Sequence, residues 1–141
     1  MTEILLAEDN PADVYLVREA LIEHQVTAML LVASDGHEVL RILFGDGQLT
    51  DRGRLGLIIL DLNLPRHDGI EILERLRQVE DLAHVPVVVL TSSDSPRDRL
   101  IATQLGATRF LRKPSGLEQF LGLGAIFKTL LEQASANSEG I

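Results

Sequence analysis

Short runs of apolar residues recur along the chain and alternate with longer amphipathic stretches. A continuous apolar run of this length is typical of a strand that is buried on both faces. The fifth run is weaker than the others because it contains arginine. The runs predicted to be strands are residues 4–7, 28–32, 57–60, 85–90 and 108–111.

The stretches between these runs begin with signals for helix N-termini. Asn10 supplies a capping side chain, Pro11 suits the first helical position, and Asp13 places an acid in the first turn. Apolar residues at helical spacing follow. Similar starts, as capping-box patterns or a Ser-Pro pair, lie at residues 35–38, 68–71, 95–96 and 115–118.

The order of elements predicts an α/β fold made of five βα units. Strands that alternate with helices form a parallel sheet with right-handed crossovers, so both faces are covered. Arg109 in the fifth run and Arg112 directly after it suit an edge strand, and the second run is quickly followed by polar residues. We therefore predict a doubly wound (βα)5 sheet with the flavodoxin-like strand order 2-1-3-4-5.

The length and composition favour one folded domain. The chain has 141 residues, of which 45% are hydrophobic, so it can bury a substantial core. We predict a domain over residues 1–133 and a flexible tail over residues 134–141, which are small and polar. Residues 44–56 form a glycine-containing loop that exceeds the usual connection of about 2–6 residues. We interpret this loop as an insertion and a candidate contact surface.

The net charge and the hydropathy of the chain limit the kinds of partner that it is expected to bind. A formal net charge of −8 repels phosphate backbones, so nucleic acid is not an expected partner. No apolar stretch approaches the roughly 20 residues of a membrane span, and no basic segment precedes the first apolar run. We therefore expect no membrane partner and a cytoplasmic location, which the absence of cysteine also fits.

Polar side chains follow four of the predicted strands. Glu8 and Asp9 end the first, Asp61 the third, Thr91 the fourth and Lys113 the fifth. Ligands of such sheets bind beyond the carboxyl ends of the strands, where the strand order reverses. In the order 2-1-3-4-5 this point lies between the first and third strands, so we expect these side chains to converge there.

Three carboxylates at one edge would repel one another. Either one of them stays protonated, or a hard cation binds among them. Mg²⁺ takes oxygen ligands and is usually held by one or two carboxylates, whereas zinc would need Cys or clustered His ligands. The remaining carboxylate can then act as a nucleophile toward phosphorus. Lys113 and Thr91 are suitable groups to neutralise the phosphoryl oxygens and to donate a hydrogen bond to them.

Taken together, these motifs resemble the receiver domains of two-component response regulators. The matching segments are residues 6–10, 60–65 with 68–69, 91–92 and 113–114, and the resemblance covers most of the chain. It implies a signalling domain that promotes only its own phosphorylation and dephosphorylation. The roles it implies are Asp61 as phospho-acceptor, Glu8 and Asp9 as Mg²⁺ ligands with the backbone carbonyl of Asn63, Lys113 as the phosphoryl-pairing lysine, Thr91 as the switch hydroxyl, and Phe110 as the switch aromatic.

Within this family the chain is similar to the stand-alone regulators that pair with bacterial phytochrome kinases. The grounds are residues 10–13, the long loop before Leu57, and residues 62–65. This narrower resemblance implies that a sensor histidine kinase, regulated by light, donates the phosphoryl group to Asp61. It also implies an unidentified downstream protein as the reader of the signal, and it is compatible with a homodimer.

Two other functions are open at this point. A phosphatase of the haloacid-dehalogenase type would also use an aspartate nucleophile, but it needs a second acid at the position of Asn63. A receiver-like binding module that signals without phosphate would keep the fold alone. Plainer interpretations of single residues are a core aromatic for Phe110 and a helix cap for Thr91, and Arg112 is expected to point to solvent.

Overall fold

The computed structural model describes residues 1–45 and 54–139, with side chains as far as Ala134. Within these ranges five strands alternate with five α-helices, and a short 3₁₀ helix precedes the fourth strand. In chain order the elements are β1 (Glu3–Ala7), α1 (Pro11–Glu23), β2 (Met29–Ala33), α2 (Gly36–Phe44), β3 (Leu55–Leu60), α3 (Gly69–Arg77), η1 (Glu80–Leu82), β4 (Val87–Thr91), α4 (Pro96–Gln104), β5 (Arg109–Arg112) and α5 (Leu117–Glu139).

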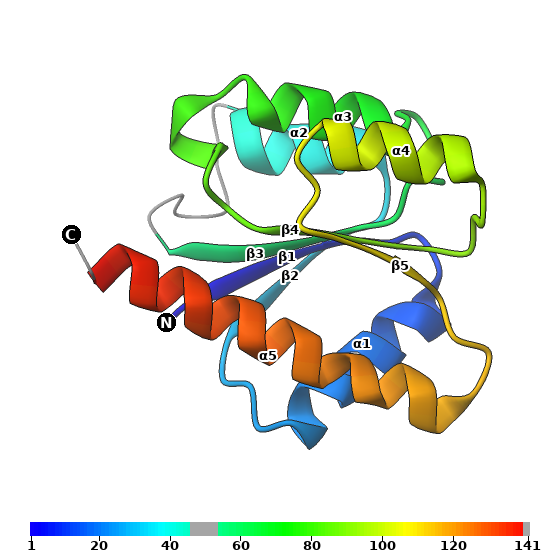
Figure 1. Ribbon diagram of the computed structural model, residues 1–141, viewed down its shortest axis with the longest axis vertical. Helices are drawn as coiled ribbons and strands as arrows, with labels where there is room; N and C mark the ends of the chain where they lie inside the picture. The colour runs from blue at the N-terminus through cyan, green and yellow to red at the C-terminus, as the bar shows by residue number, and fades with distance from the viewer. Residues whose placement is uncertain (46–53, 140–141) are drawn as a thin grey trace.

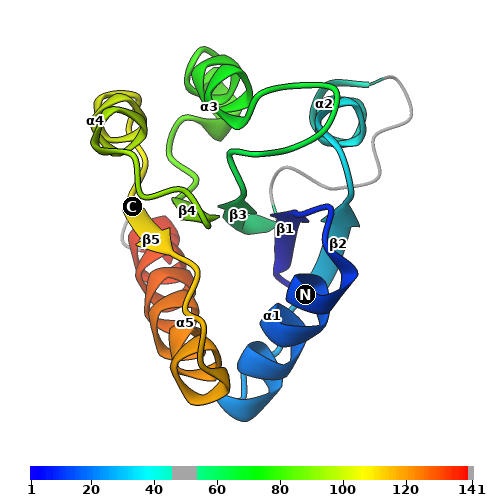
Figure 2. The ribbon, with the colours of Figure 1, turned by 90° about the vertical axis from the view of Figure 1, so that its right-hand side faces the viewer.

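The strands form one parallel sheet in the order β2-β1-β3-β4-β5. Helices α1 and α5 lie on one face of the sheet, and α2, α3 and α4 lie on the other (Figures 1 and 2). The predicted doubly wound fold and strand order are therefore confirmed, with β2 and β5 at the edges.

The side chains of β1 explain why its sequence is apolar without alternation. Leu5 and Ala7 pack into the core beneath α2 and α3, whereas Ile4 and Leu6 pack into the core beneath α1 and α5. All four are at most 1% exposed. Successive strand residues point to opposite faces, so a strand between two helical layers needs apolar residues at every position.

The fourth strand begins later than the predicted run 85–90. Pro86 has no N–H to give to a ladder, although its carbonyl accepts a bond of 3.0 Å from the N–H of Ile58. The N–H of Val85 instead bonds the carbonyl of Leu82, so Val85 belongs to the turn of η1. Regular pairing therefore starts at Val87.

The two segments predicted to be irregular are only partly described. Residues 46–53 of the predicted loop 44–56 lie outside the described residues. Helix α5 continues to Glu139, into the segment 134–141. The flexibility of that tail and the domain boundary at 133 stay predictions. Among the residues that the structure describes, no helix is both long enough and apolar enough to cross a bilayer.

Four helices begin close behind the carboxyl ends of the strands, and each start is held by a side-chain cap. A cap accepts a backbone N–H that the first helical turn leaves unpaired. The helix starts therefore frame the same sheet edge at which the strands end. The capping residues are Asn10 for α1, Asp35 for α2, Asp68 for α3 and Ser95 for α4.

Candidate functional site

The register of β1 and β3 brings two acids together. Ala7 is paired with Leu60, so the residues that follow, Glu8 and Asp61, leave the sheet at the same level. The N–H of Asp61 extends the ladder by bonding the carbonyl of Ala7 at 3.0 Å. Both residues are buried, with 3% of the surface of Glu8 and 4% of that of Asp61 exposed.

Together with Asp9, these two acids form a cluster that has the dimensions of a cation site. Glu8, Asp9 and Asp61 each offer one carboxylate oxygen, and these oxygens all lie within 4.8 Å of one another. Asp9 is exposed, unlike the other two, so the cluster is open to solvent on its side. Three hard oxygen ligands with an open side match the chemistry of a divalent ion that keeps several waters.

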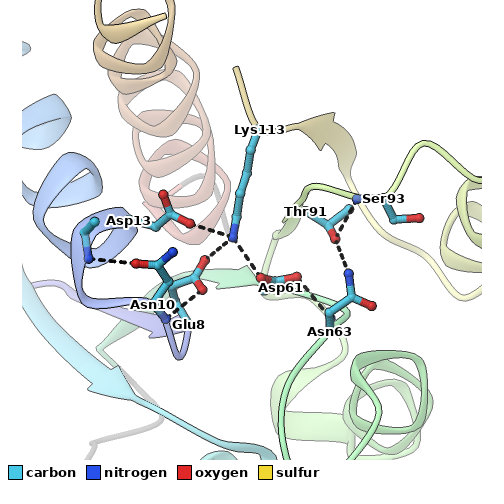
Figure 3. Close-up of polar contacts among 9 residues, drawn as sticks. Glu8, Asn10, Asp13, Asp61, Asn63, Thr91, Ser93 and Lys113 are labelled. Atoms are coloured by element: carbon cyan, nitrogen blue, oxygen red, sulfur yellow. Dashed lines mark hydrogen bonds and ion pairs between the residues drawn. The ribbon is translucent and has the colours of Figure 1, made fainter. Parts of the chain in front are cut away.

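Lys113, just beyond β5, reaches into this cluster (Figure 3). Its Nζ lies 2.7 Å from Oε1 of Glu8 and 2.9 Å from Oδ2 of Asp61. Its backbone N–H bonds the carbonyl of Thr91 at 2.8 Å, which fixes the direction of the chain. The lysine side chain is 13% exposed. The side chains of Glu8, Asp61 and Lys113 therefore lie together at one edge of the sheet, as the sequence predicted.

A third carboxylate, Asp13, also contacts the lysine, although its place in the sequence predicted only the start of a helix. Its Oδ2 lies 2.9 Å from Nζ of Lys113, and its side chain is 19% exposed. The first turn of α1 stands directly behind Asp9, so acids in that turn lie close to the site. The position of Asp13 in this turn was the available signal.

Asn63 and Thr91 are linked to each other beside Asp61. The N–H of Asn63 donates to Oδ1 of Asp61 at 3.0 Å, and its Nδ2 lies 3.4 Å from Oγ1 of Thr91. Thr91 is fully buried, and its Oγ1 also accepts the N–H of Ser93 at 3.3 Å. Figure 3 shows Asn63 joined by hydrogen bonds to both Asp61 and Thr91.

Phe110 and Arg112 lie on β5, away from the acid cluster. The Phe110 ring is half-buried against the core under α3 and α4, and the Arg99 guanidinium lies 4.9 Å from its centre. Arg112 is 64% exposed and forms an ion pair of 3.6 Å with Asp94. The expectation that Arg112 points to solvent is confirmed, and the switch role of Phe110 stays a prediction.

The electrostatics of the cluster follow from its burial and its charges. Burial raises the pKa of the Glu8 carboxyl above 4.5, against hydrogen bonds from Lys113 and from the N–H of Asn10, while the Asp61 charge raises it further. Burial acts to lower the pKa of Lys113, but hydrogen bonds to Glu8, Asp13 and Asp61 outweigh burial and raise it. The ammonium of Lys113 therefore stays charged. It is a single positive charge in contact with three carboxyl groups.

Comparison with known families gives one match that covers most of the chain. Residues 4–123 match the family described as the response regulator receiver domain. The chain is 38% identical over 115 residues to the response regulator Rcp1 of Synechocystis sp. (strain ATCC 27184 / PCC 6803 / Kazusa), covering 82% of this chain and 78% of that protein. Several other curated relatives are longer, and the chain spans less than half of their length.

The solved structures that resemble the whole fold include two response regulators. One is the phosphorylated cyanobacterial phytochrome response regulator RcpA, at 33% identity and a TM-score of 0.82, covering 90% of this chain and 91% of that one. The other is the Mn²⁺-bound form of Rcp1, at 34% identity and a TM-score of 0.82, covering 92% and 93%.

Proposed function

Because this chain belongs to the response regulator receiver domains, we propose that it accepts a phosphoryl group on Asp61 and signals through a change of shape. The observation that carries the proposal is the contact of Asp61 Oδ2 with the Lys113 ammonium at 2.9 Å, inside a cluster of acids. A buried nucleophilic carboxylate, a fixed cation and a candidate metal site are the parts that phosphoryl transfer to a carboxylate needs.

We propose that a divalent cation, Mg²⁺, binds to Glu8, Asp9 and Asp61, with the Asn63 carbonyl as a further ligand. The support is the spacing of the three carboxylate oxygens and their hard-donor chemistry. When bound, the ion would neutralise negative charge on the phosphoryl oxygens. The Mn²⁺-bound form of Rcp1 supports a divalent ion in a related protein.

The residues of the chain provide the nucleophile and its positioning. A carboxylate oxygen of Asp61 forms a bond to phosphorus, and the bond from phosphorus to the nitrogen of a donor phosphohistidine breaks. The electron pair of that bond leaves with the imidazole, which takes up a proton. The Asn63 N–H on Oδ1 and the Lys113 ammonium on Oδ2 hold the carboxylate before the step.

We propose that Thr91 reports the new charge. Its hydroxyl is held by Ser93 and Asn63 on one side of the site. Phosphoryl oxygens on Asp61 would give this hydroxyl a stronger acceptor, and its movement would shift the segment that starts α4. Phe110 packs beside α4 and would respond to such a shift.

The proposed donor is a sensor histidine kinase, and RcpA, a phytochrome response regulator of related sequence, supports a light-regulated one. The reader of the signal would be another protein or a second copy of this chain. Phosphotransfer from purified candidate kinases, compared by initial rate, tests the donor. A phytochrome kinase that transfers no faster than unrelated kinases would contradict this part of the proposal.

The acceptor role is tested by incubating the protein with Mg²⁺ and acetyl phosphate and measuring its intact mass. We expect one added phosphoryl group on the wild type and on Asp94→Asn, a matched control at an exposed acid near the same edge. We expect none on Asp61→Asn and none when a chelator removes the metal. A phosphoryl group that persists on Asp61→Asn would contradict the proposal.

A further inference from the structure

Asp13 is a half-buried partner of Lys113 that the proposed phosphoryl transfer does not itself use. We propose that Asp13 is a positioning residue, which holds the Lys113 ammonium at the phosphoryl position before and during transfer. This inference rests on the proposed function. It assigns a role to a carboxylate from the first turn of α1, far in sequence from the lysine it contacts.

The contacts of Lys113 leave none of its donors free. An ammonium has three N–H groups. Glu8, Asp13 and Asp61 lie at 2.7, 2.9 and 2.9 Å from Nζ and can accept all three (Figure 3). The flexible four-carbon stem of a lysine has many rotamers, so such contacts are what keep the charge at one point.

Of the three acids, only Asp13 has no other task in the proposed reaction. Glu8 and Asp61 belong to the carboxylate cluster that fits a cation, and Asp13 is outside that cluster. A bound cation would draw the Glu8 oxygens toward itself, and phosphorylation would convert the Asp61 carboxylate into an acyl phosphate, a mixed anhydride. Asp13 is then the one contact in this set that Lys113 keeps through every stage.

The local structure makes Asp13 a rigid anchor. Asn10 caps α1 by accepting the N–H of Ala12 at 2.9 Å, and Pro11 fixes the first helical residue. The N–H of Asn10 also donates to Oε2 of Glu8 at 3.1 Å. The helix start therefore holds both Glu8 and Asp13 relative to Lys113, and it places the Asp13 carboxylate on the lysine from the α1 side.

A plainer role for Asp13 is to stabilise α1, because an acid in the first helical turn interacts favourably with the helix dipole. The two roles predict different measurements. A purely stabilising acid would change the melting temperature and leave the transfer rate of the folded protein unchanged. A positioning acid would change the rate, and only in a protein that has Lys113.

The test uses Asp13→Asn, which removes the charge and keeps the shape, with Glu23→Gln as a control that removes one exposed charge from the same helix. Phosphoryl uptake is followed at saturating Mg²⁺ over a range of acetyl phosphate concentrations. We expect Asp13→Asn to lower the maximal rate by roughly ten-fold or more with little change in KM, since misplacement of a charged group can slow a reaction by up to about a hundred-fold. Glu23→Gln should match the wild type.

The same comparison in a Lys113→Met background isolates the contact. If Asp13 acts through the lysine, Asp13→Asn causes no further loss there. A further loss of equal size, or an unchanged rate in the single variant with a lowered melting temperature, would overturn the inference and leave the acceptor role intact. A wild type that takes up no phosphoryl group would overturn both.

Discussion

Lys113 provides the positive charge that partly neutralises the carboxylates of the site. One ammonium faces Glu8, Asp13 and Asp61, and Asp9 adds a further carboxylate at the open side. The excess of negative charge is what a divalent ion would relieve. At the separations here a unit charge pair is worth about 1 kcal/mol in water and several times more in a partly buried site, so small changes of charge should be measurable.

Replacing Lys113 should separate metal binding from phosphoryl transfer. We expect Lys113→Met to slow phosphoryl uptake by roughly a hundred-fold, since removing one charge-stabilising donor has an effect of about that size. Mg²⁺ should bind the variant at least as tightly as the wild type, because a competing positive charge next to Glu8 is gone. Titration calorimetry and intact mass measure the two quantities, and a large loss of Mg²⁺ affinity would contradict this account.

The pH dependence of metal binding should follow Glu8. Its pKa in the folded protein is raised above 4.5, so the carboxyl must lose a proton to become a metal ligand as pH rises through the raised value. Mg²⁺ affinity should therefore rise with pH across that window and level off above it. In the metal-free protein the contribution of Glu8 to stability is present below pH 4.5 and is lost as pH rises through the folded-state pKa.

Calorimetric Mg²⁺ titrations at a series of pH values, for the wild type and Glu8→Gln, check this prediction. The wild type should show the rise, and Glu8→Gln should bind Mg²⁺ weakly with a flatter profile. A wild-type affinity that does not rise with pH above 4.5, the ordinary pKa of a glutamate carboxyl, would contradict the role given to Glu8.

At the scale of elements, the strands and their carboxyl-terminal residues could be predicted from the sequence. Continuous apolar runs require a sheet covered on both faces, and parallel strands end at one edge, so Glu8, Asp61 and Lys113 could be brought together without coordinates. The late start of β4 was missed because the apolar run includes Pro86, which breaks the ladder without breaking the hydrophobic pattern.

Asp13 could not be predicted as a partner of Lys113 by the same reasoning. It lies on a helix rather than at a strand end, and its contact depends on the angle at which α1 leaves the sheet. The link between Asn63 and Thr91 was missed for a related reason. Two loops of different strands must approach within hydrogen-bond distance, and strand register alone does not fix the paths of loops.

The packing of α1 on α5 is tested by two glycines of α5. A Cβ on Gly124 would lie 2.3 Å from the carbonyl oxygen of Ala20 and 2.5 Å from Cδ2 of His24, whereas a Cβ on Gly122 would meet nothing within 4 Å. We expect Gly124→Ala to lower the free energy of unfolding by about 1–3 kcal/mol through overpacking. Gly122→Ala is the matched control and should raise it by about 0.5–1 kcal/mol.

Urea unfolding of both variants measures these changes. Equal stabilisation by the two substitutions would mean that α1 and α5 are not in close contact at Gly124. Asp13 lies in α1, so a displacement of this helix would also move the carboxylate that contacts Lys113. Gly124→Ala should therefore slow phosphoryl uptake more than Gly122→Ala does.

At the scale of the whole molecule, hydrogen bonds connect Asp61, the proposed acceptor, to the start of α4. Asn63 contacts both Asp61 and Thr91, and Ser93 bonds Thr91 with its N–H and Asp98 with its hydroxyl, the latter at 3.0 Å. The N–H of Asp98 in turn bonds the capping Ser95. A change at Asp61 therefore has a continuous physical route to α4 and to Phe110 beside it.

The most direct test of the central claim is to locate the phosphoryl group by reduction with borohydride. An acyl phosphate is reduced to an alcohol, whereas a free carboxylate is not, so a phosphorylated aspartate becomes homoserine. Peptide mass spectrometry after treatment with Mg²⁺ and acetyl phosphate should find homoserine in place of Asp61, and aspartate unchanged at positions 9 and 13. Reduction at another acid, with Asp61 intact, would contradict the account.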